Sequence, residues 1–181
     1  MIEETSEQVA LRVVADEEWP LWRDLRRTAV ADAPHAFCSR VDDWDRGEEA
    51  RWRAMSTGPD SYNLVADVNA RPVGMARGVR LRTGTESAYE LRSVWVAPEA
   101  RGRGVADRLV AAVEEWALRQ GARSLRLLVA PGNPSADALY RRHGYLPTGE
   151  LGGPAPDGVG RQYAMAKDLR ADRPAPEARP S

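Results

Sequence analysis

Gly102 and Gly104, within the stretch from Val94 to Ala106, carry the most specific chemistry in the sequence, which is the binding of phosphate. An apolar strand pattern ends at Pro98, and a strong helix pattern begins near Gly104. Glycine permits positive φ and close backbone approach, while a helix N-terminus presents unpaired N–H groups and a positive dipole end. The stretch therefore predicts a phosphate-binding loop, with an ordinary glycine-rich turn as the alternative.

Arg101 and Arg103 alternate with these glycines and are expected to add positive charge at the mouth of the loop. The lysine-containing spacing of a P-loop is absent, which argues against a nucleoside triphosphatase. The dinucleotide fingerprint is also incomplete, because Asp107 stands where its third glycine or alanine belongs and no acidic residue follows at the end of the next strand. Both patterns therefore point away from the two commonest phosphate-loop folds.

The spacing of apolar residues places these motifs in a series of strands and helices, with Gly and Pro at their ends. The expected strands are 9–14, 62–68, 73–82, 89–96, 124–130, 145–150 and 161–167, and the expected helices are 16–34 with Asp16 as N-cap, 41–55, 104–120 and 134–142. The alternation in 89–96 is only half regular, as expected for a strand buried in part on both faces. The order β-αα-βββ-α-β-α-ββ predicts an α/β (α+β) sandwich, with helices on both faces of a mixed sheet.

The loop and a second motif together resemble one enzyme family. Arg101-x-x-Gly104-x-Ala106 has the Arg/Gln-x-x-Gly-x-Gly/Ala form with which GNAT N-acetyltransferases bind the pyrophosphate of acetyl-CoA. The stretch 133–145 resembles their Asn-x-x-Ala-x-x-Leu-Tyr segment followed by Gly-Tyr/Phe, and the two matches stand in the family order with a strand between them. The resemblance covers about residues 9–169 and implies a GNAT-type, mostly antiparallel central sheet with acetyl-CoA as cosubstrate.

The resemblance also implies a set of cofactor contacts. Backbone N–H groups near Val94 and Val96 are implied to hold the pantetheine arm and the thioester carbonyl, in the manner of an oxyanion hole. Asn133 is implied to contact the cofactor, and a simple helix N-cap is the alternative. The residues expected to bind the cofactor are Val94, Trp95, Val96, Arg101, Gly102, Arg103, Gly104, Val105, Ala106, Asn133 and Ala136.

Tyr140 and Glu90 are the candidate catalytic residues. A phenol is protonated at neutral pH and can give its proton to a thiolate leaving group, which is the role that the resemblance implies for Tyr140. A core tyrosine packed with Leu139 is the alternative. Glu90 lies six residues before Val96 on a strand where many family members carry a glutamate that deprotonates the amine, often through water. A solvent-facing strand residue is the alternative for Glu90.

In this family the segment between the first two helices borders the acceptor pocket. His35, Phe37 and Trp44 are therefore expected to contact the substrate, with His35 as a second candidate base and core packing as the alternative for Trp44. We expect a small-molecule amine as acceptor, including an amine-bearing antibiotic. Protein N-terminal amines and a non-catalytic acyl-CoA-binding module are the alternatives. Acidic residues between 32 and 48 would attract a cationic acceptor or form an ordinary solvated helix face.

The amino-acid composition argues against several other classes of protein. The 181 residues carry 26 basic and 27 acidic side chains, so the net charge of −1 lacks the basic excess of a nucleic-acid binder. No apolar run approaches the ~18 residues of a membrane span, and the acidic first residues lack a secretory pattern. One cysteine and two histidines exclude an internal disulfide and a multi-Cys or multi-His metal centre.

The expected organisation is a flexible leader over 1–8, one domain over 9–169 and a disordered tail over 170–181. We expect a cytoplasmic protein with no metal, no nucleic-acid partner and no membrane anchor. The family resemblance adds a homodimer as its expected assembly.

Overall fold

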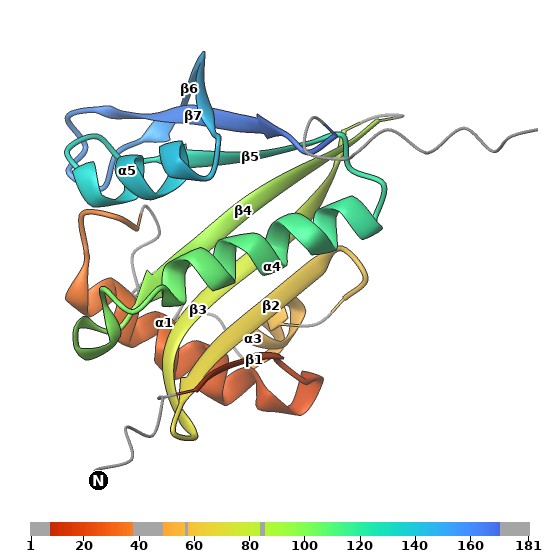
Figure 1. Ribbon diagram of the computed structural model, residues 1–181, viewed down its shortest axis with the longest axis vertical. Coiled ribbons are helices and arrows are strands. Elements are labelled where there is room, and N and C mark those ends of the chain that lie inside the picture. The colour runs from red at the N-terminus through yellow and green to blue at the C-terminus, as the bar shows by residue number, and fades with distance from the viewer. Residues whose placement is uncertain (1–7, 38–48, 57, 84–85, 171–181) are drawn as a thin grey trace, which may run out of the picture.

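A seven-stranded sheet forms the frame of the protein (Figure 1). The computed structural model describes residues 8–37, 49–56, 58–83 and 86–170. The strands are β1 (Val9–Val13), β2 (Ser61–Val68), β3 (Arg71–Thr83), β4 (Glu86–Val96), β5 (Ser124–Val129), β6 (Leu146–Pro154) and β7 (Arg161–Asp168). They stand in the order β1-β2-β3-β4-β5-β7-β6, and all neighbours are antiparallel except β4 with β5. The expected mixed, mostly antiparallel sheet is confirmed.

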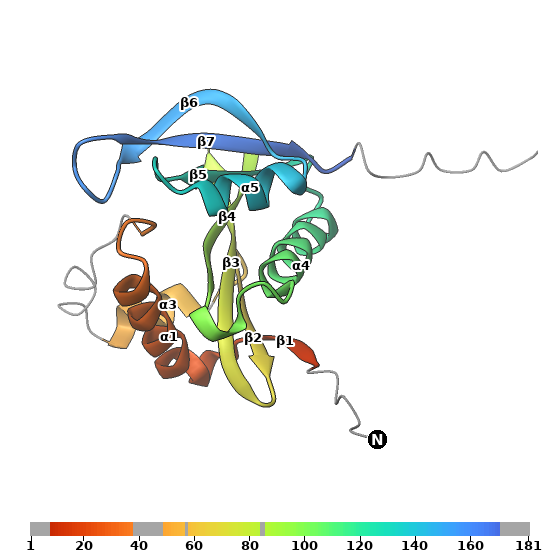
Figure 2. The ribbon, with the colours of Figure 1, turned by 60° about the vertical axis from the view of Figure 1, so that its left-hand side comes forward.

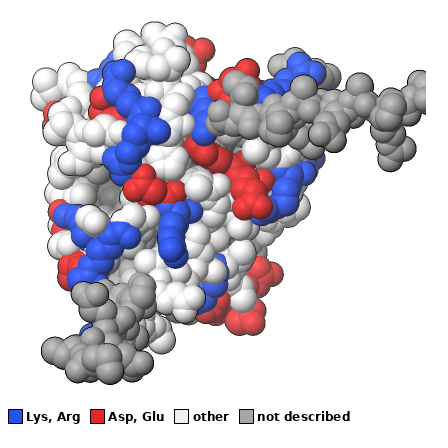
Figure 3. All heavy atoms as spheres, viewed as in Figure 1, with Lys and Arg blue, Asp and Glu red and all other residues white. Residues whose placement is uncertain are grey.

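Helices cover both faces of this sheet. The helices are α1 (Trp19–Asp32), α3 (Glu49–Ser56), α4 (Val105–Arg119) and α5 (Pro134–Arg142), with short 3-10 turns at Asp16–Glu18 and Pro98–Ala100. Figure 2 shows α1 and α3 on one face and α4 on the other, with α5 beside β5. On the α4 side of the molecule, basic and acidic side chains are interspersed (Figure 3). Within the described residues, no helix is long and apolar enough to cross a membrane.

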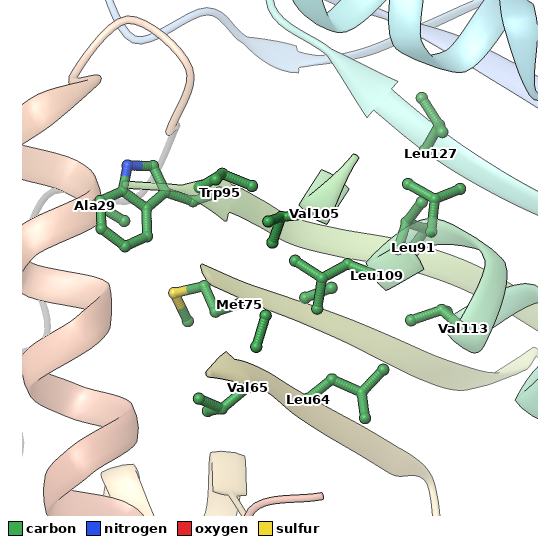
Figure 4. Close-up of a cluster of buried hydrophobic side chains, with 14 of the residues drawn as sticks. Ala29, Leu64, Val65, Met75, Leu91, Trp95, Val105, Leu109, Val113 and Leu127 are labelled. Atoms are coloured by element: carbon green, nitrogen blue, oxygen red, sulfur yellow. The ribbon is translucent and has the colours of Figure 1, made fainter. Parts of the chain in front are cut away.

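The apolar core fills the space between the sheet and the helices (Figure 4). Leu91 and Val113 belong to the side that faces α4, whereas Trp95 reaches toward α1. Gly78 permits the close approach of α4 to β3, because a Cβ there would lie 2.5 Å from the ring of Trp116. The strong apolar stripe of α4 therefore packs directly on the strands that lead to the predicted phosphate loop.

The expected elements occur in the expected order, with differences at their ends. The strand expected over 145–150 extends to Pro154, and 49–56 of the helix expected over 41–55 form α3. Residues 41–48 lie outside the described residues. Asp16 does not cap α1, because it begins a 3-10 turn in which the Glu18 carboxylate accepts a hydrogen bond from the Ala15 N–H at 2.9 Å.

A bulge at Ser93 changes the direction of β4. Arg92 pairs with Arg77 and Trp95 pairs with Met75, so two residues of β4 stand opposite one residue of β3 between these pairs. Ser93 has a φ of 54°, which is uncommon for a residue other than glycine and marks the distortion. The expected burial on both faces is confirmed, because the consecutive residues Glu90 and Leu91, and Trp95 and Val96, are buried, and the bulge adds to the irregular alternation.

Beyond this region β4 and β5 separate. Their parallel pairing is limited to Glu90 with Arg126 and Leu91 with Leu127. Residues 92–96 of β4 and 128–129 of β5 continue without pairing to each other. Backbone N–H and C=O groups along these two edges therefore have no partner in the neighbouring strand and can bind a polar ligand.

An ion-pair cluster holds the end of α5 against the start of α4. The Asp107 carboxylate accepts hydrogen bonds from Nε and Nη2 of Arg142 at 2.8 and 2.9 Å, and it lies 3.0 Å from Nε2 of His143. Its bonds with Arg142 and then with His143 lower the pKa of Asp107 to about 2. Behind it, Lys167 of β7 donates to the Glu114 carboxylate of α4 at 3.1 Å. These contacts fix the position of α5 relative to the predicted phosphate loop.

We expect Asp107→Asn to lower the free energy of unfolding by roughly 1 kcal/mol at pH 7, because solvent screens part of this ion pair. A carboxyl whose pKa falls on folding stabilises the protein above its unfolded pKa of about 4, and this stabilisation is lost as the pH falls toward 2. The difference in Tm between wild type and variant should therefore shrink from pH 7 to pH 3. Asp24→Asn on the exposed surface of α1 is the control, and an unchanged difference would contradict the assignment.

Candidate active site

The opening between β4 and β5 contains a cavity of about 90 Å³. Its lining comes from four parts of the chain, which are the segment after α1, the bulged part of β4, the end of β5 and one face of α5. Of the residues predicted from the sequence, the cavity brings together Phe37, Val94, Asn133, Ala136 and Tyr140. Segments distant in sequence thus meet where the two strands diverge.

The local sequence of α5 directs one helical face into this cavity. The Asn133 side chain accepts a hydrogen bond from the Ala136 N–H at 3.1 Å, which confirms the N-cap, and Pro134 occupies the first turn. Gly144, with a φ of 86°, follows the helix end. Asn133, Ala136 and Tyr140 are three and four residues apart and so share the face that lines the cavity.

Tyr140 offers a protonated hydroxyl to the cavity. The side chain is half-buried, and its ring lies edge-on to that of Tyr145 with 5.9 Å between centroids. Burial raises the pKa of Tyr140, so the phenol stays protonated at neutral pH. Among the described residues its hydroxyl has no hydrogen-bond partner, whereas the adjacent Leu139 takes the buried position on this turn. The arrangement suits a proton donor to a group bound in the cavity.

Glu90 is buried beside the cavity, with 4% of its surface exposed. One carboxylate oxygen accepts a hydrogen bond from Nε of Arg92 at 2.5 Å, and the other lies 3.3 Å from Nε of Arg126. A buried carboxylate requires such partners. The alternative of a solvent-facing Glu90 is therefore wrong, and both of its oxygens already contact guanidinium groups.

The loop after β4 has the backbone that a phosphate cradle requires. Gly102 and Gly104 have φ values of 75° and 73°, and a Cβ at either position would meet no atom within 4 Å. The backbone is therefore open at the start of α4, where the first-turn N–H groups lack intrahelical acceptors. Val105 is buried and Ala106 half-buried, so they anchor this turn in the core. These features fit the pyrophosphate of acetyl-CoA.

The two arginines of the loop, Arg101 and Arg103, point in different directions. Arg101 turns toward α1, where its Nη2 contacts the Asp32 carboxylate, while its Nε donates to the Val96 carbonyl at 3.0 Å. Trp95 donates from Nε1 to the same carboxylate at 2.9 Å. Arg101 therefore ties the loop to α1, and Asp32 balances the charge that was expected at the loop mouth. Arg103 is exposed beside the loop.

The three residues expected to contact the acceptor have different positions relative to the cavity. Phe37 lines the cavity, and its ring lies 5.6 Å from the guanidinium carbon of Arg26. His35 is exposed and does not line the cavity, so the geometry does not favour it as a base. Trp44 lies outside the described residues, while Trp52 packs in the core.

Sequence reasoning missed Ser93 and three arginines near it. Arg26 of α1 donates from Nη1 to the Ser93 hydroxyl at 2.7 Å, and Arg92 lines the cavity. Arg77 of β3 stands directly opposite Arg92. The sequence did carry one indication of them, because charged residues stand between apolar residues within the expected strands. Burying a charged side chain costs free energy unless a partner or a ligand compensates its charge.

Comparisons with known proteins agree with this geometry. The sequence matches the acetyltransferase (GNAT) family over residues 19–145. An acetyltransferase from Pectobacterium atrosepticum is 31% identical over 108 residues, which are 60% of this chain and 73% of that protein. The chain belongs to the GNAT acetyltransferase family. It is an acetyl-CoA-dependent N-acetyltransferase, as the two sequence motifs implied.

Two solved structures show how closely the fold of this N-acetyltransferase follows its family. The structure of YncA from Salmonella typhimurium with its cofactor acetyl-CoA superposes with a TM-score of 0.71 at 18% identity, covering 94% of this chain and 99% of that one. The aminoglycoside N-acetyltransferase AAC(6')-Iy in complex with CoA superposes with a TM-score of 0.66 at 19% identity, covering 83% and 95%. At these identities the similarity establishes the fold.

We expect Gly104→Val to weaken acetyl-CoA binding at least tenfold, because a side chain would enter the phosphate-binding space and strain a left-handed backbone. Gly121→Val is the matched control, since Gly121 lies after the other end of α4 with a φ of 83° and an equally open Cβ position. Calorimetric titration with acetyl-CoA, with NAD as comparator, measures the effect. Equal affinity losses in the two variants would contradict a phosphate-binding role for Gly104.

Proposed function

We propose that this protein acetylates the primary amine of a small molecule by direct attack on acetyl-CoA in a ternary complex. The single observation that carries this proposal is the cavity between β4 and β5, which is lined by Tyr140, whose hydroxyl has no hydrogen-bond partner among the described residues. The fold is similar both to an aminoglycoside N-acetyltransferase and, with the same TM-score of 0.66, to a ribosomal-protein-alanine N-acetyltransferase from Brucella melitensis, so the choice of a small acceptor rests on the cavity. The glycine loop follows β4, so a cofactor bound there can extend along the open strand edge.

The cofactor side depends on backbone groups. Acetyl-CoA, when bound, supplies an activated thioester. Amide N–H groups of Val94 and Val96 would hold the pantetheine arm and polarise the thioester carbonyl, because this edge of β4 does not pair with β5. The N-terminus of α4, with Gly102 and Gly104, would bind the pyrophosphate.

On the acceptor side, the attacking amine must lose a proton. Glu90 is the proposed base, and it lies on the same strand as the open edge. Because Arg92 and Arg126 contact its two oxygens, a proton would reach Glu90 through a water molecule that the carboxylate orients. Neither Glu90 nor His35 is in the cavity lining, but Glu90 is buried on the strand whose next residues, Leu91 and Arg92, line the cavity, whereas His35 is exposed, which favours Glu90 in this role.

Tyr140 would protonate the departing thiolate of CoA. Burial raises the pKa of its phenol, which keeps the proton available but weakens its acidity. The same desolvation raises the proton affinity of a thiolate formed in the cavity, so the two groups remain matched. The proton thus moves from the Tyr140 oxygen to the CoA sulfur as the carbon–sulfur bond breaks.

The proposed reaction is tested by amine-dependent release of the CoA thiol from acetyl-CoA, with a panel of small amines and one peptide. Release with small amines supports the proposal, and release with the peptide alone would assign a protein acceptor instead. Binding of acetyl-CoA without release by any amine would show an acyl-CoA-binding module.

We expect Tyr140→Phe to lower kcat by roughly 100-fold while leaving the Kd for acetyl-CoA unchanged, because the ring is retained and the donated proton is lost. The same thiol assay measures kcat, and calorimetry measures binding. Tyr62→Phe is the control, since Tyr62 stacks on Trp116 away from the cavity with 5.4 Å between ring centroids. Wild-type turnover in the Tyr140 variant would rule out its role as the acid.

A further inference from the structure

Three arginines from three elements gather beside the cavity, on the side of the sheet that faces α1. Arg77 of β3 pairs directly with Arg92 of β4, and Arg26 of α1 binds Ser93, the next residue of β4. We call these three residues the arginine cluster. Like charges directly opposite on antiparallel strands destabilise the pair. The cluster therefore has an electrostatic cost, which needs a compensating interaction.

The three guanidinium groups act on one another electrostatically. Burial, followed by the charges of Arg92 and Arg26, lowers the pKa of Arg77 to about 10. Burial and the charge of Arg92 likewise lower the pKa of Arg26. The groups thus share one poorly solvated region, in which an added negative charge would relieve their repulsion.

Arg92 has donors available for such a charge in the cavity, whereas Arg77 lies outside the cavity lining and would act through its charge. Arg77 donates from Nη2 to the Ser61 hydroxyl at 2.9 Å, and its buried Nε makes no hydrogen bond with the described residues. Arg92 uses Nε for Glu90, while neither of its Nη atoms bonds to any described residue. The Arg92 side chain is 44% exposed and lines the cavity. It can therefore meet a ligand there.

Among the described residues, the carboxylate in contact with the cluster does not balance the paired charges of Arg77 and Arg92. Within the described part of the chain, Glu90 is the acidic residue in contact with Arg92, and Glu90 also contacts Arg126. Glu150 lies 3.7 Å from Arg126 and is exposed. Arg126 of β5 lies beside the cluster and contacts both of these carboxylates, so part of their negative charge is already balanced by Arg126.

The position of the cluster places the missing anion next to the reacting groups. Arg92 lines the same cavity as Tyr140 and lies two residues from Glu90 on β4. An anionic group bound to Arg92 would therefore be close enough to an amine attacking in this cavity for both groups to belong to one small molecule, separated by a few covalent bonds. A planar guanidinium binds a carboxylate or another compact oxyanion through paired hydrogen bonds.

We propose that the acceptor is a small amine that also carries a compact oxyanion, such as the carboxylate of an amino acid, and that Arg92 binds this group while the nearby charge of Arg77 adds to the attraction. This inference rests on the proposed acetylation of a small amine and names the class of that acceptor. It opposes a polycationic acceptor, because a second ammonium group beside the arginine cluster would be repelled.

The test compares matched acceptors with the full-length protein in the thiol-release assay. The panel contains L-amino acids, their carboxamides, their decarboxylated amines, the corresponding aminophosphonates and kanamycin. We expect kcat/KM to be roughly 10- to 100-fold higher for an acid than for its carboxamide, since the charged hydrogen bonds to arginine are lost. The phosphonates distinguish a requirement for a carboxylate from a requirement for any oxyanion.

Two variants assign the preference to the cluster. Arg92→Lys should raise KM for the preferred acid about tenfold or more, because the paired hydrogen bonds are lost, and Arg77→Gln should raise it by a smaller factor, because a nearby charge is lost. Neither variant should change KM for the carboxamide or the Kd for acetyl-CoA. Arg92→Lys keeps a positive charge beside Glu90, so it remains informative if Arg77→Gln lowers stability. Arg82→Gln is the control, because Arg82 is exposed on the same strand, points to the other face and pairs with Asp60.

The outcomes separate this inference from the proposed function. Equal kcat/KM for acids and carboxamides, or preference for kanamycin, would overturn the inference while leaving the acetylation of small amines intact. An acid preference that persists unchanged in both arginine variants would also overturn it. Binding of acetyl-CoA with no release by any amine would overturn both proposals.

Discussion

The site depends on the distortion of β4 at Ser93, because a strand cannot turn its edge toward a ligand while it remains paired on both sides. The bulge breaks the register with β3 and lies just after Leu91, the last residue of β4 that pairs with β5. The unpaired edges then supply backbone donors, and the ends of the two strands diverge. The glycine loop follows the end of β4, whereas α5 with Tyr140 follows the end of β5. The bulged part of β4 thus lies between the predicted phosphate loop and the proposed acid.

Contacts on both faces of the sheet hold the elements around this opening in place. On one side, α4 lies close to β3 because Gly78 leaves room for Trp116, and Asp107 at its start binds Arg142 of α5. On the other side, Asp32 of α1 binds both Trp95 and Arg101 and so ties the loop to α1. The loop and α5 are therefore held from opposite faces of the sheet. A site supported in this way is organised before its substrates bind, which reduces the cost of ordering it.

Much of the fold could be predicted from the sequence, because apolar periodicity and the Gly and Pro positions are local signals. The glycine loop and the N-cap at Asn133 were readable for the same reason. The bulge was not, since the positive φ of Ser93 depends on its pairing with β3. The direction of Arg101 was equally hidden, because its partner Asp32 lies 69 residues away. The burial of Glu90 required knowing that Arg126 would stand opposite it. Each failure concerns a contact between elements, which no local pattern specifies.

In the proposed site Arg92 would connect recognition to chemistry, because its guanidinium contacts Glu90 through Nε and its side chain lines the cavity. An oxyanion bound at the Nη atoms of this guanidinium would share the charge of Arg92 with Glu90, and so weaken the attraction that holds the base. The carboxylate would then be freer to take up the proton of the amine when an acidic acceptor is in place. A lysine could not do both, since its single ammonium lacks the fixed divergent donors of arginine. The repulsion within the arginine cluster is thus consistent with a site whose charges are balanced only when the acceptor is bound.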